Sequence, residues 1–453
     1  MKQLETQDVT KTFYLILPFF MHISMACDIS NVREYNCRGE GGSLAKLTCN
    51  CLPDAEVIVK PNCIQEYSTS EIEFNDCRSV TFEAKSVDMR NLRQINLNRI
   101  QSIAFTENSI SWYGDVRRDS QDERFDITVP ALKVRVRDSV VSSIASHAFS
   151  GKINEIIFDG VTFDEIQPLA FSNLLQTEKI VIKNSTIRSL GVYAFKKFGT
   201  EMLDLNGVAA DLVPSRAFSN LRVYQSFTIN NCSFNTVRSD GFIIEQPTLF
   251  QVTHSNISNL NTEAFNVAAR GKVLFKNNTF GIVGDRAFDK ITKTDVFHNP
   301  DFIFDSNTFK RISRYSLTID DFDVKFRNIF INEPCDCNSL DHKIKDTYYY
   351  EDIQCLQDGN YITIKDYKSS MCSVITDHYI TIIISCVVAV LLIGVISALA
   401  LYYKFVYMSK KYGSKDQSNK NGNLSLIVPD GRTYRETELH VIVERTDLLT
   451  TDL

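Results

Sequence analysis

Ile180-Val-Ile-Lys-Asn-Ser-Thr-Ile-Arg-Ser-Leu-Gly-Val-Tyr-Ala-Phe195 is one copy of a pattern that recurs through the middle of this 453-residue chain. Each copy ends in a phenylalanine, usually behind an alanine, and the phenylalanines return every 22 to 24 residues. They are Phe149, Phe171, Phe195, Phe218, Phe242, Phe265 and Phe288. A fixed period of this length indicates one small structural unit stacked on itself. The sequence therefore predicts a solenoid whose function lies on a repeated surface.

Each copy also contains two apolar residues spaced two apart. Ile180 and Ile182 lie fifteen and thirteen residues before Phe195, and Leu203 and Leu205 hold the same places before the next phenylalanine. This alternation is typical of a short strand with one buried face. Because one strand cannot bury its own apolar face, we expect the core to form between neighbouring copies.

The apolar spacing and the terminal Ala-Phe pair resemble extracellular leucine-rich repeat proteins, over roughly residues 70 to 330. The resemblance implies an α/β-type repeat solenoid, mostly parallel β: a horseshoe with one strand per unit and about eight or nine units within residues 78–333. That family usually has Asn, or a small hydrogen-bonding residue, ten positions before the phenylalanine, where it satisfies backbone groups at the bend. Here the position holds Ser139, Ser185, Cys232, Ser255 and Asn278, but also Val161 and Val208. A right-handed parallel β-helix is the alternative fold, and it would show three strands per coil.

The 12 cysteines gather mainly at the two ends of the repeat region. They include Cys27, Cys37, Cys49, Cys51, Cys63 and Cys77 before it, and Cys335, Cys337, Cys355 and Cys372 after it. Solenoids need terminal caps, and small extracellular caps are commonly disulfide-bonded, so residues 27–77 and 334–373 are predicted to be caps.

The family resemblance implies that Cys335 pairs with Cys355 and that Cys337 pairs with Cys372. Six cysteines allow 15 pairings, so the N-terminal connectivity stays open. Cys77 could instead be a buried free thiol of a repeat strand. Zinc is not expected, because His342 lacks ligand spacing.

Two apolar segments set the expected topology. Residues 1–26 resemble a signal peptide, with Lys2 and Lys11, an apolar run and small residues before Cys27. Residues 379–403 carry no charge and are long enough to cross a bilayer. Lys404 and further lysines follow, which predicts a cytoplasmic tail at residues 404–453. We therefore expect a single-pass type I protein of the plasma membrane.

Four sequons for N-glycosylation lie in the repeat region, at Asn184, Asn231, Asn256 and Asn277. Asn184, Asn231 and Asn277 each lie eleven residues before their phenylalanine, so their glycans would form a ridge along one edge. The alternative is that asparagine is simply favoured at a bend.

Outward-pointing residues of the strands are the candidate partner-binding surface, on the sheet that a horseshoe would make concave. Its first part is basic, with Lys133, Arg135, Arg137, Lys179 and Lys183. A basic patch could bind an acidic protein or a sulfated glycan, and the alternative is a solvated charged face. The net charge of −6 and the extracellular location disfavour nucleic acid.

Catalytic motifs are not found in the sequence. The seven histidines are scattered, and no nucleophile elbow, phosphate loop or zinc helix is present. We expect neither an enzyme nor a bound cofactor.

Short motifs at the C-terminus suggest cytoplasmic partners. Thr451-Asp-Leu453 resembles a class I PDZ ligand, whose terminal carboxylate would be bound at the edge of a PDZ-domain sheet. Glu444 with Leu448 and Leu449 resembles an acidic dileucine sorting signal for a clathrin adaptor.

These features suggest a cell-surface recognition or adhesion protein that binds an extracellular protein through its repeats and a PDZ scaffold through its tail. The alternatives are a ligand-binding receptor or co-receptor, and a structural component of an apical membrane or cell junction. The short tail favours adhesion.

Overall fold

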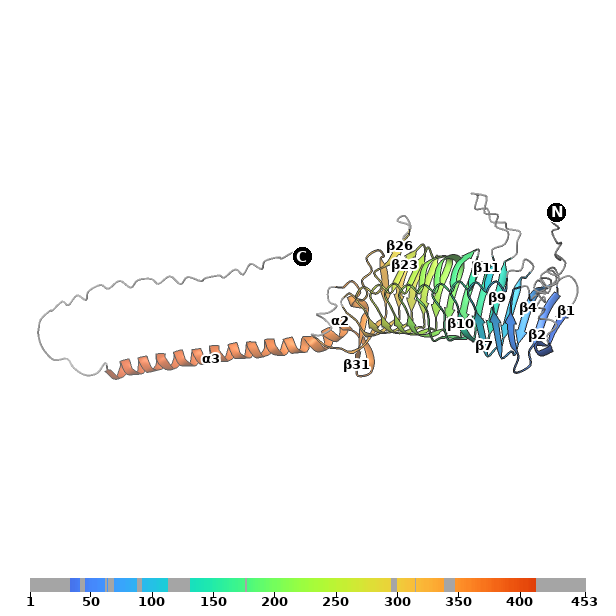
Figure 1. Ribbon diagram of the computed structural model, residues 1–453. Coiled ribbons are helices and arrows are strands. Elements are labelled where there is room, and N and C mark those ends of the chain that lie inside the picture. The colour runs from blue at the N-terminus through green and yellow to red at the C-terminus, as the bar shows by residue number, and fades with distance from the viewer. Residues whose placement is uncertain are drawn as a thin grey trace, which may run out of the picture. The chain divides into compact units, whose positions relative to one another are not determined.

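The computed structural model describes residues 33–40, 45–61, 63, 69–87, 92–112, 131–175, 177–294, 300–313, 315–337 and 347–412. The chain forms two compact units, Met1–Thr376 and Asp377–Leu453. The first contains a stack of β-coils and the second contains most of a long helix (Figure 1). Each unit is described by itself.

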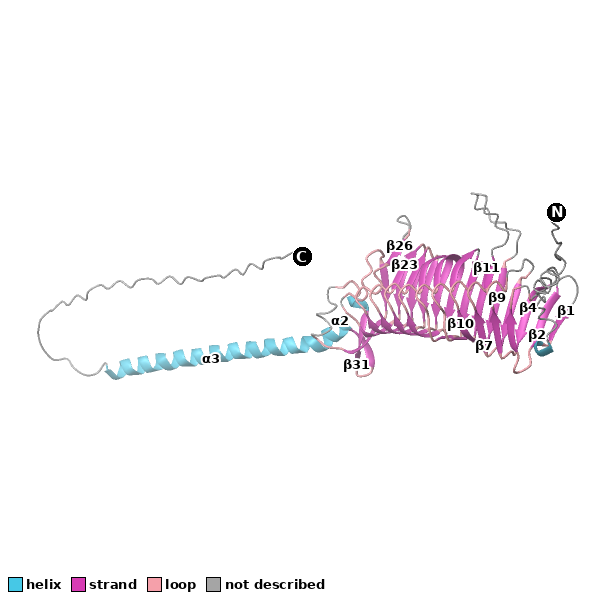
Figure 2. Cartoon of the chain, in the orientation of Figure 1, coloured by secondary structure: helices cyan, strands magenta, loops and turns pink. Residues whose placement is uncertain are grey.

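The coils in the middle of the solenoid are built from three β-segments joined by short turns (Figure 2). One coil consists of β20 (Phe242–Glu245), β21 (Leu249–Thr253) and β22 (Asn256–Leu260). The next consists of β23 (Phe265–Ala269), β24 (Lys272–Lys276) and β25 (Thr279–Val283), each parallel to its counterpart. Three strands per coil fit the β-helix alternative rather than the one-strand unit of a horseshoe. The described coils connect their strands by turns, so the expected α/β character is absent there.

A first sheet of 18 strands forms two sides of the solenoid among the described residues. Twelve of these follow one another along the stack and are called here the central strands. They are β2 (Ala45–Asn50), β4 (Thr69–Asn75), β6 (Gln94–Asn98), β9 (Leu132–Arg137), β11 (Phe149–Asp159), β14 (Thr177–Lys183), β16 (Phe195–Asn206), β18 (Phe218–Asn230), β21, β24, β27 (Phe302–Asp305) and β29 (Val324–Arg327).

The other side of this sheet begins at the recurring phenylalanine in six coils, those from Phe149 to Phe265. It is formed by β8 (Ile110–Trp112), β13 (Phe171–Leu175), β20, β23 and β26 (Ile291–Lys293), and by the first halves of β11, β16 and β18, which run on into central strands. The phenylalanine therefore opens a strand, whereas the leucine-rich interpretation made it the end of a unit.

A second sheet of 14 strands closes the solenoid. Its strands are β3 (Glu56–Val59), β5 (Ser79–Phe82), β7 (Ser102–Phe105), β10 (Val140–Ile144), β12 (Thr162–Phe163), β15 (Thr186–Ile187), β17 (Ala209–Val213), β19 (Ser233–Val237), β22, β25, β28 (Thr308–Arg311), β30 (Ile329–Pro334), β31 (Ile353–Gln357) and β32 (Asn360–Thr363).

The stack has about twelve coils, more than the eight or nine units expected. The difference arises at both ends. β2 pairs in parallel with β4, inside the predicted N-terminal cap, and β31 pairs in parallel with β30, inside the predicted C-terminal cap. The coils thus extend into both cysteine-rich regions.

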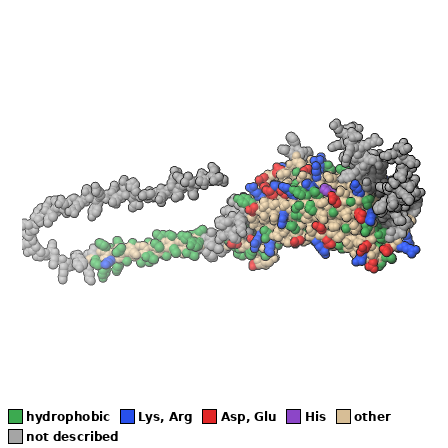
Figure 3. All heavy atoms as spheres, viewed as in Figure 1, with side chains coloured by type: hydrophobic (Ala, Val, Ile, Leu, Met, Phe, Trp, Pro, Cys, Tyr) green, Lys and Arg blue, Asp and Glu red, His purple; other side chains and the backbone are tan. Residues whose placement is uncertain are grey.

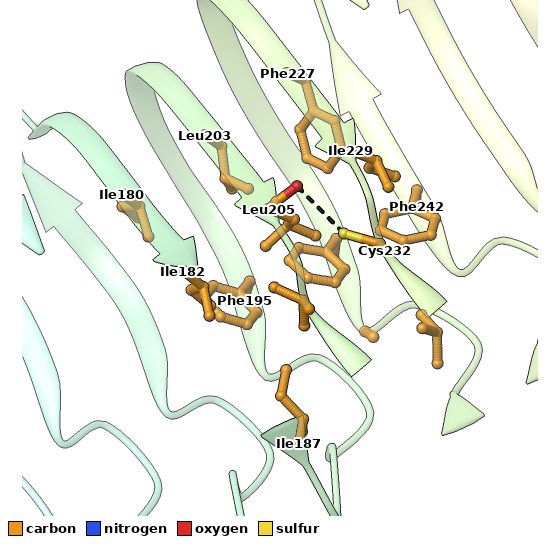
Figure 4. Close-up of a cluster of buried hydrophobic side chains, with 14 of the residues drawn as sticks. Ile180, Ile182, Ile187, Phe195, Leu203, Leu205, Phe227, Ile229, Cys232 and Phe242 are labelled. Carbon is orange, nitrogen blue, oxygen red and sulfur yellow. Dashed lines mark hydrogen bonds between the residues drawn. The ribbon is translucent and has the colours of Figure 1, made fainter. Parts of the chain in front are cut away.

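The recurring phenylalanines form a continuous column in the core. Successive rings from Phe82 to Phe288 have centroids 4.5 to 6.0 Å apart, and Phe195 stacks almost parallel on Phe171 and Phe218. These rings are almost fully buried. A stacked pair adds roughly 0.5–1.5 kcal/mol to the gain from burial. Figure 4 shows Phe195 and Phe242 pointing into the interior that Cys232 also faces.

Small polar residues fill the interior of several of the bends that follow the central strands. The backbone amides of Val161 and Ser255 donate to Ser185 Oγ (3.1 Å) and Asn278 Oδ1 (2.9 Å) of the next coil. The free thiol of Cys232 takes the same place and lies 3.3 Å from the Leu205 carbonyl oxygen (Figure 4). The expected role of the residue ten positions before the phenylalanine, satisfying backbone groups at the bend, holds in this fold too.

The N-terminal end of the stack carries disulfides and a reversed strand. After η3 (Arg33–Tyr35), β1 (Cys37–Glu40) pairs antiparallel with β2, and Cys37 is bonded to Cys49. Cys51 is bonded to Cys77, which is therefore not the free thiol considered above, and Cys63 is also disulfide-bonded.

The C-terminal end is closed by aromatic packing and by two disulfides. Tyr349 is buried and packs on Phe326, the last ring of its row, at 5.3 Å. η4 (Tyr350–Asp352) leads into β31, and β32 returns antiparallel to it. Cys335 is bonded to Cys355 and Cys337 to Cys372, the pairs that the family resemblance implies.

Among the described residues, one helix is long and apolar enough to cross a membrane. α2 (Ile364–Tyr367) and the π-helical η5 (Lys368–Cys372) lead into α3 (Ser373–Tyr412). Within α3 the candidate span is Tyr379–Met408, somewhat longer than the predicted 379–403.

Candidate functional site: the outer face of the first sheet

The outer face is formed by the outward-pointing side chains of the central strands from β9 to β29. Alternate residues of each strand point inward and outward, as in β14, where Ile180 and Ile182 are buried and Lys179, Val181 and Lys183 are accessible. Parallel pairing in register places equivalent residues of successive coils side by side in three rows. Charges of both signs are interspersed on the visible side of the solenoid (Figure 3).

A buried carboxylate organises the basic residues at the start of this face. Glu155 of β11 lies 3.7 Å from Lys133 Nζ, 3.3 Å from Arg135 Nη2 and 3.1 Å from Lys179 Nζ. Burial raises the pKa of Glu155, but Lys179 and Arg135 lower it by more, so the pKa lies below its ordinary value. The fully ionised carboxylate thus holds three cations from both neighbouring coils.

The five basic residues predicted to bind a partner are therefore mostly engaged within the sheet. Besides the three around Glu155, Lys183 Nζ lies 3.0 Å from Asp159. Arg137 is exposed at the end of β9. The structure brings the five together on β9 and β14, the strands on either side of β11, but as a network of ion pairs rather than as a free basic patch.

The middle of the outer face is largely uncharged. β16, β18 and β21 present Met202, Asp204, Asn206, Ser226, Thr228, Asn230, Leu249, Gln251 and Thr253. Hydrogen bonds run across the strands, from Asn230 Nδ2 to Asn206 Oδ1 (3.4 Å) and from Thr253 Oγ1 to Asn230 Oδ1 (2.8 Å). This part of the face is a pre-ordered polar surface with Met202 exposed at its edge.

Asp204 is the one ionisable side chain in this neutral centre. It is half-buried between Val181 of β14 and Thr228 of β18, and among the described residues it has neither an ion pair nor a hydrogen bond from its side chain. Burial raises the pKa of its carboxyl above the ordinary value. A carboxylate in such a place is left without compensation by any other described residue.

Charge pairs return beyond the centre. Lys276 of β24 lies 3.1 Å from Asp305 of β27, and Lys325 of β29 pairs with Asp301. The outer face thus has a neutral centre between two ion-paired regions, and Asp204 lies within that centre.

All four predicted glycosylation residues are exposed. Asn184, Asn231 and Asn277 lie at the corner between the central strands and the second sheet, each with a positive φ of 50 to 56°. Asp138, Gly160, Gly207 and His254 hold the same corner in other coils with positive φ. The left-handed conformation favours Asn and Gly, which accounts for the common register of the three sequons. Asn256 begins β22 on the second sheet.

Sequence reasoning did not identify Glu155 or the isolation of Asp204. The repeat spacing could have identified Glu155, since it lies 22 residues after Lys133 and 24 before Lys179, at the equivalent position of the coil between them. No sequence pattern indicated the isolation of Asp204, because it depends on the side chains that the two neighbouring coils place beside it.

Several predicted sites lie outside the described residues. These are the signal peptide at 1–26 with Cys27, the PDZ ligand at Thr451 and Leu453, and the sorting signal at Glu444, Leu448 and Leu449. Within the described parts of the chain, no group of three His, Cys, Asp or Glu side chains could hold a metal ion.

The fold defines a class, a disulfide-bonded parallel β-solenoid followed by an apolar helix. Comparison with protein families, curated proteins and solved structures found no match for the chain.

Proposed function

We propose that this chain is a cell-surface recognition or adhesion protein, and that it binds an extracellular protein through the neutral centre of the outer face. The proposal places the solenoid outside the cell and α3 across the plasma membrane. Disulfides at both ends of the solenoid and the length of the apolar helix support this placement.

The observation that carries the proposal is the unpaired, half-buried Asp204 at the centre of an otherwise neutral face. Protein interfaces are depleted of charge at their centre and polar at their rim, and a central charge usually has its partner on the other protein. A lysine or arginine of the partner would compensate Asp204. The flanking charges are already paired within the sheet, so they would form the rim.

The size of the face suits a protein partner. Nine central strands from β9 to β29, spaced about 4.8 Å apart and about five residues wide, cover roughly 600 Å², close to the ~800 Å² that one partner buries in a standard interface. Glycans on Asn184, Asn231, Asn256 and Asn277 would shield the neighbouring corner and the second sheet. They would leave the first sheet as the accessible side.

A binding screen with matched charge reversals tests the proposal. The tagged ectodomain would be applied to an array of secreted and cell-surface proteins, and each partner would be measured again with Asp204→Lys and Asp211→Lys. Asp211 is exposed on β17, in the second sheet, and accepts a hydrogen bond from Asn235 (2.9 Å). We expect Asp204→Lys to lower the affinity at least ~30-fold, about 2 kcal/mol, which is typical of a central interface residue. Binding that Asp211→Lys weakens and Asp204→Lys does not would contradict the proposal.

A cell-aggregation assay separates adhesion from a receptor function. Clustering of cells that express the full chain, and its loss with Asp204→Lys, is the expected result. Binding of a soluble ligand without clustering would favour the receptor alternative. The proposed cytoplasmic partners, a PDZ-domain scaffold and a clathrin adaptor, would be tested separately by deleting Leu453 and by replacing Leu448 and Leu449 with alanine.

A further inference from the structure

Two side chains of opposite charge lie on the outer face without an ion pair. Asp204 of β16 is one, and Lys272 at the start of β24 is the other. Lys272 is exposed, and the ion pairs among the described residues include Lys276 of the same strand but not Lys272. β18 and β21 lie between β16 and β24, so about 14 Å separates the two strands. One chain thus carries both members of an ion pair at positions where they cannot meet.

A second copy of the chain can bring these two charges together. Two outer faces can meet about a two-fold axis that runs parallel to the strands, midway between β18 and β21. This rotation keeps the direction of the strands and reverses the order of the coils, so β16 lies opposite β24 of the copy, and β24 opposite β16. Stacked sheets lie about 10 Å apart, a gap that an aspartate and a lysine extended toward each other span. Each dimer would then contain two Asp204–Lys272 pairs.

Other residues of the face match at the same position of the axis. β14 then lies opposite β27 of the copy, and β11 opposite β29. Four pairs of facing residues are of opposite charge or are both apolar: Lys179 and Asp301, Lys183 and Asp305, Asp159 and Arg327, and Val181 and Ile303. Glu155 faces Asp323, a residue of like charge, but three cations of its own sheet already surround Glu155.

Neighbouring positions of the axis fit less well. An axis that lies on β18 sets β14 against β24, so that Lys179 and Lys183 face two further lysines. An axis between β16 and β18 sets opposite charges together at the rim, but it places Asp204 opposite Thr228 of the copy, with no cation on the strands beside it. The isolated carboxylate therefore selects the axis between β18 and β21.

We propose that the partner of the outer face is a second copy of this chain, held by reciprocal Asp204–Lys272 ion pairs. The inference rests on the proposed function and names the partner of the same site. The eight strands from β11 to β29 cover roughly 500 Å² of each copy, which is in the range of weak and transient interfaces. Many such contacts between crowded copies would act together.

Exchanging the two charges tests the pairing. The full-length chain would be purified in detergent, and a labelled trace of it would be titrated with unlabelled chain and followed by sedimentation velocity with fluorescence detection. The variants are Asp204→Lys and Lys272→Asp, each alone, mixed with one another, and combined in one chain. Asp211→Lys, on the second sheet, is the matched control.

We expect the wild-type chain and the Asp211→Lys variant to dimerise equally. Each single variant at Asp204 or Lys272 sets like charges against each other twice in a dimer, so its Kd should rise at least ~30-fold. The mixture of Asp204→Lys with Lys272→Asp restores both pairs and should associate as the wild-type chain does, and so should the double variant. This recovery also shows that the single variants are folded.

The possible failures are distinguishable. Wild-type self-association without recovery in the mixture or in the double variant would overturn the Asp204–Lys272 pairing, and this inference with it. No wild-type self-association, together with binding of a different protein that Asp204→Lys weakens, would overturn the second copy and leave the proposed function in place. Binding of a different protein that Asp204→Lys does not weaken would overturn both.

Discussion

The inside and the outside of the solenoid follow opposite rules, although they belong to the same coils. Inside, nine phenylalanines from Phe82 to Phe288 repeat almost without change and stack on one another. Outside, equivalent positions hold Arg135, Ile157, Val181, Asp204 and Thr228 in successive coils. The repeated side determines the fold, because every coil needs the same packing. The varied side is free to differ from coil to coil, because the stack does not need one residue type at its outward positions.

Removing one ring of the column should have the largest effect. Phe195→Ala would leave a cavity between Phe171 and Phe218, and we expect the free energy of unfolding of the ectodomain to fall by about 3–5 kcal/mol. Chemical denaturation measures it. Tyr224→Ala, at a position 44% exposed, is the control and should change stability by less than about 1 kcal/mol. Equal effects at the two positions would contradict the distinction between inside and outside.

Neutralising the buried carboxylate of the outer face should have an intermediate effect. Glu155→Gln leaves Lys133, Arg135 and Lys179 without their common partner, and we expect a loss of about 2 kcal/mol at pH 7. The pKa of Glu155 is lower in the folded chain than its ordinary value, so its contribution is complete above the unfolded pKa of about 4.3 and is lost as the pH falls through the folded value.

The stability difference between wild type and Glu155→Gln should therefore shrink below about pH 4, as measured by denaturation at a series of pH values. Asp211→Asn, on the second sheet, is a matched control without a cation partner. If the stability difference between wild type and Glu155→Gln stays constant down to strongly acidic pH, the ion pairs of Glu155 contribute nothing to stability.

The smallest effects are expected at the corner of the coils, where the backbone and not the side chain imposes the choice of residue. Asn231 has a φ of 52°. Asn231→Gly should leave stability within about 0.5 kcal/mol, whereas Asn231→Val should cost about 1–2 kcal/mol, because a β-branched residue is strained there. Thermal unfolding of the two variants compares them, and both also remove the sequon. Equal losses from Gly and Val would show that the Asn side chain, or a glycan on it, carries the stability.

Much of the solenoid could be predicted from the phenylalanine period. The period located the buried strand positions, such as Ile180 and Ile182, and the hydrogen-bonding residue at the bend, such as Asn278. It did not reveal the third strand, because the stretch after the phenylalanine alternates poorly. Phe195-Lys-Lys-Phe198 has two lysines together, and the register shifts between β16 and β18. The cysteines also made the first coils difficult to recognise in the sequence, because Cys49 and Cys77 occupy core positions in a strand and a turn there.

The candidate site was less accessible from the sequence. Lys133 and Arg135 were visible as charges, but their engagement depends on Glu155 from the next coil. The isolation of Asp204 depends on Val181 and Thr228, one coil to either side. Such properties depend on the register between coils, which cannot be inferred from each residue of the sequence taken separately.

At each end of the stack, a terminal strand runs antiparallel to its neighbour and so does not continue the parallel coils. β1 and β32 are only four residues long and antiparallel to their neighbours. A disulfide joins β1 to β2 at one end, and at the other end a disulfide joins β31 to Cys335, directly after β30. An open parallel edge would be a template on which another copy could add, as in a fibril. With the ends closed in this way, many copies can crowd together without polymerising end to end, so that contacts between molecules are left to their sides.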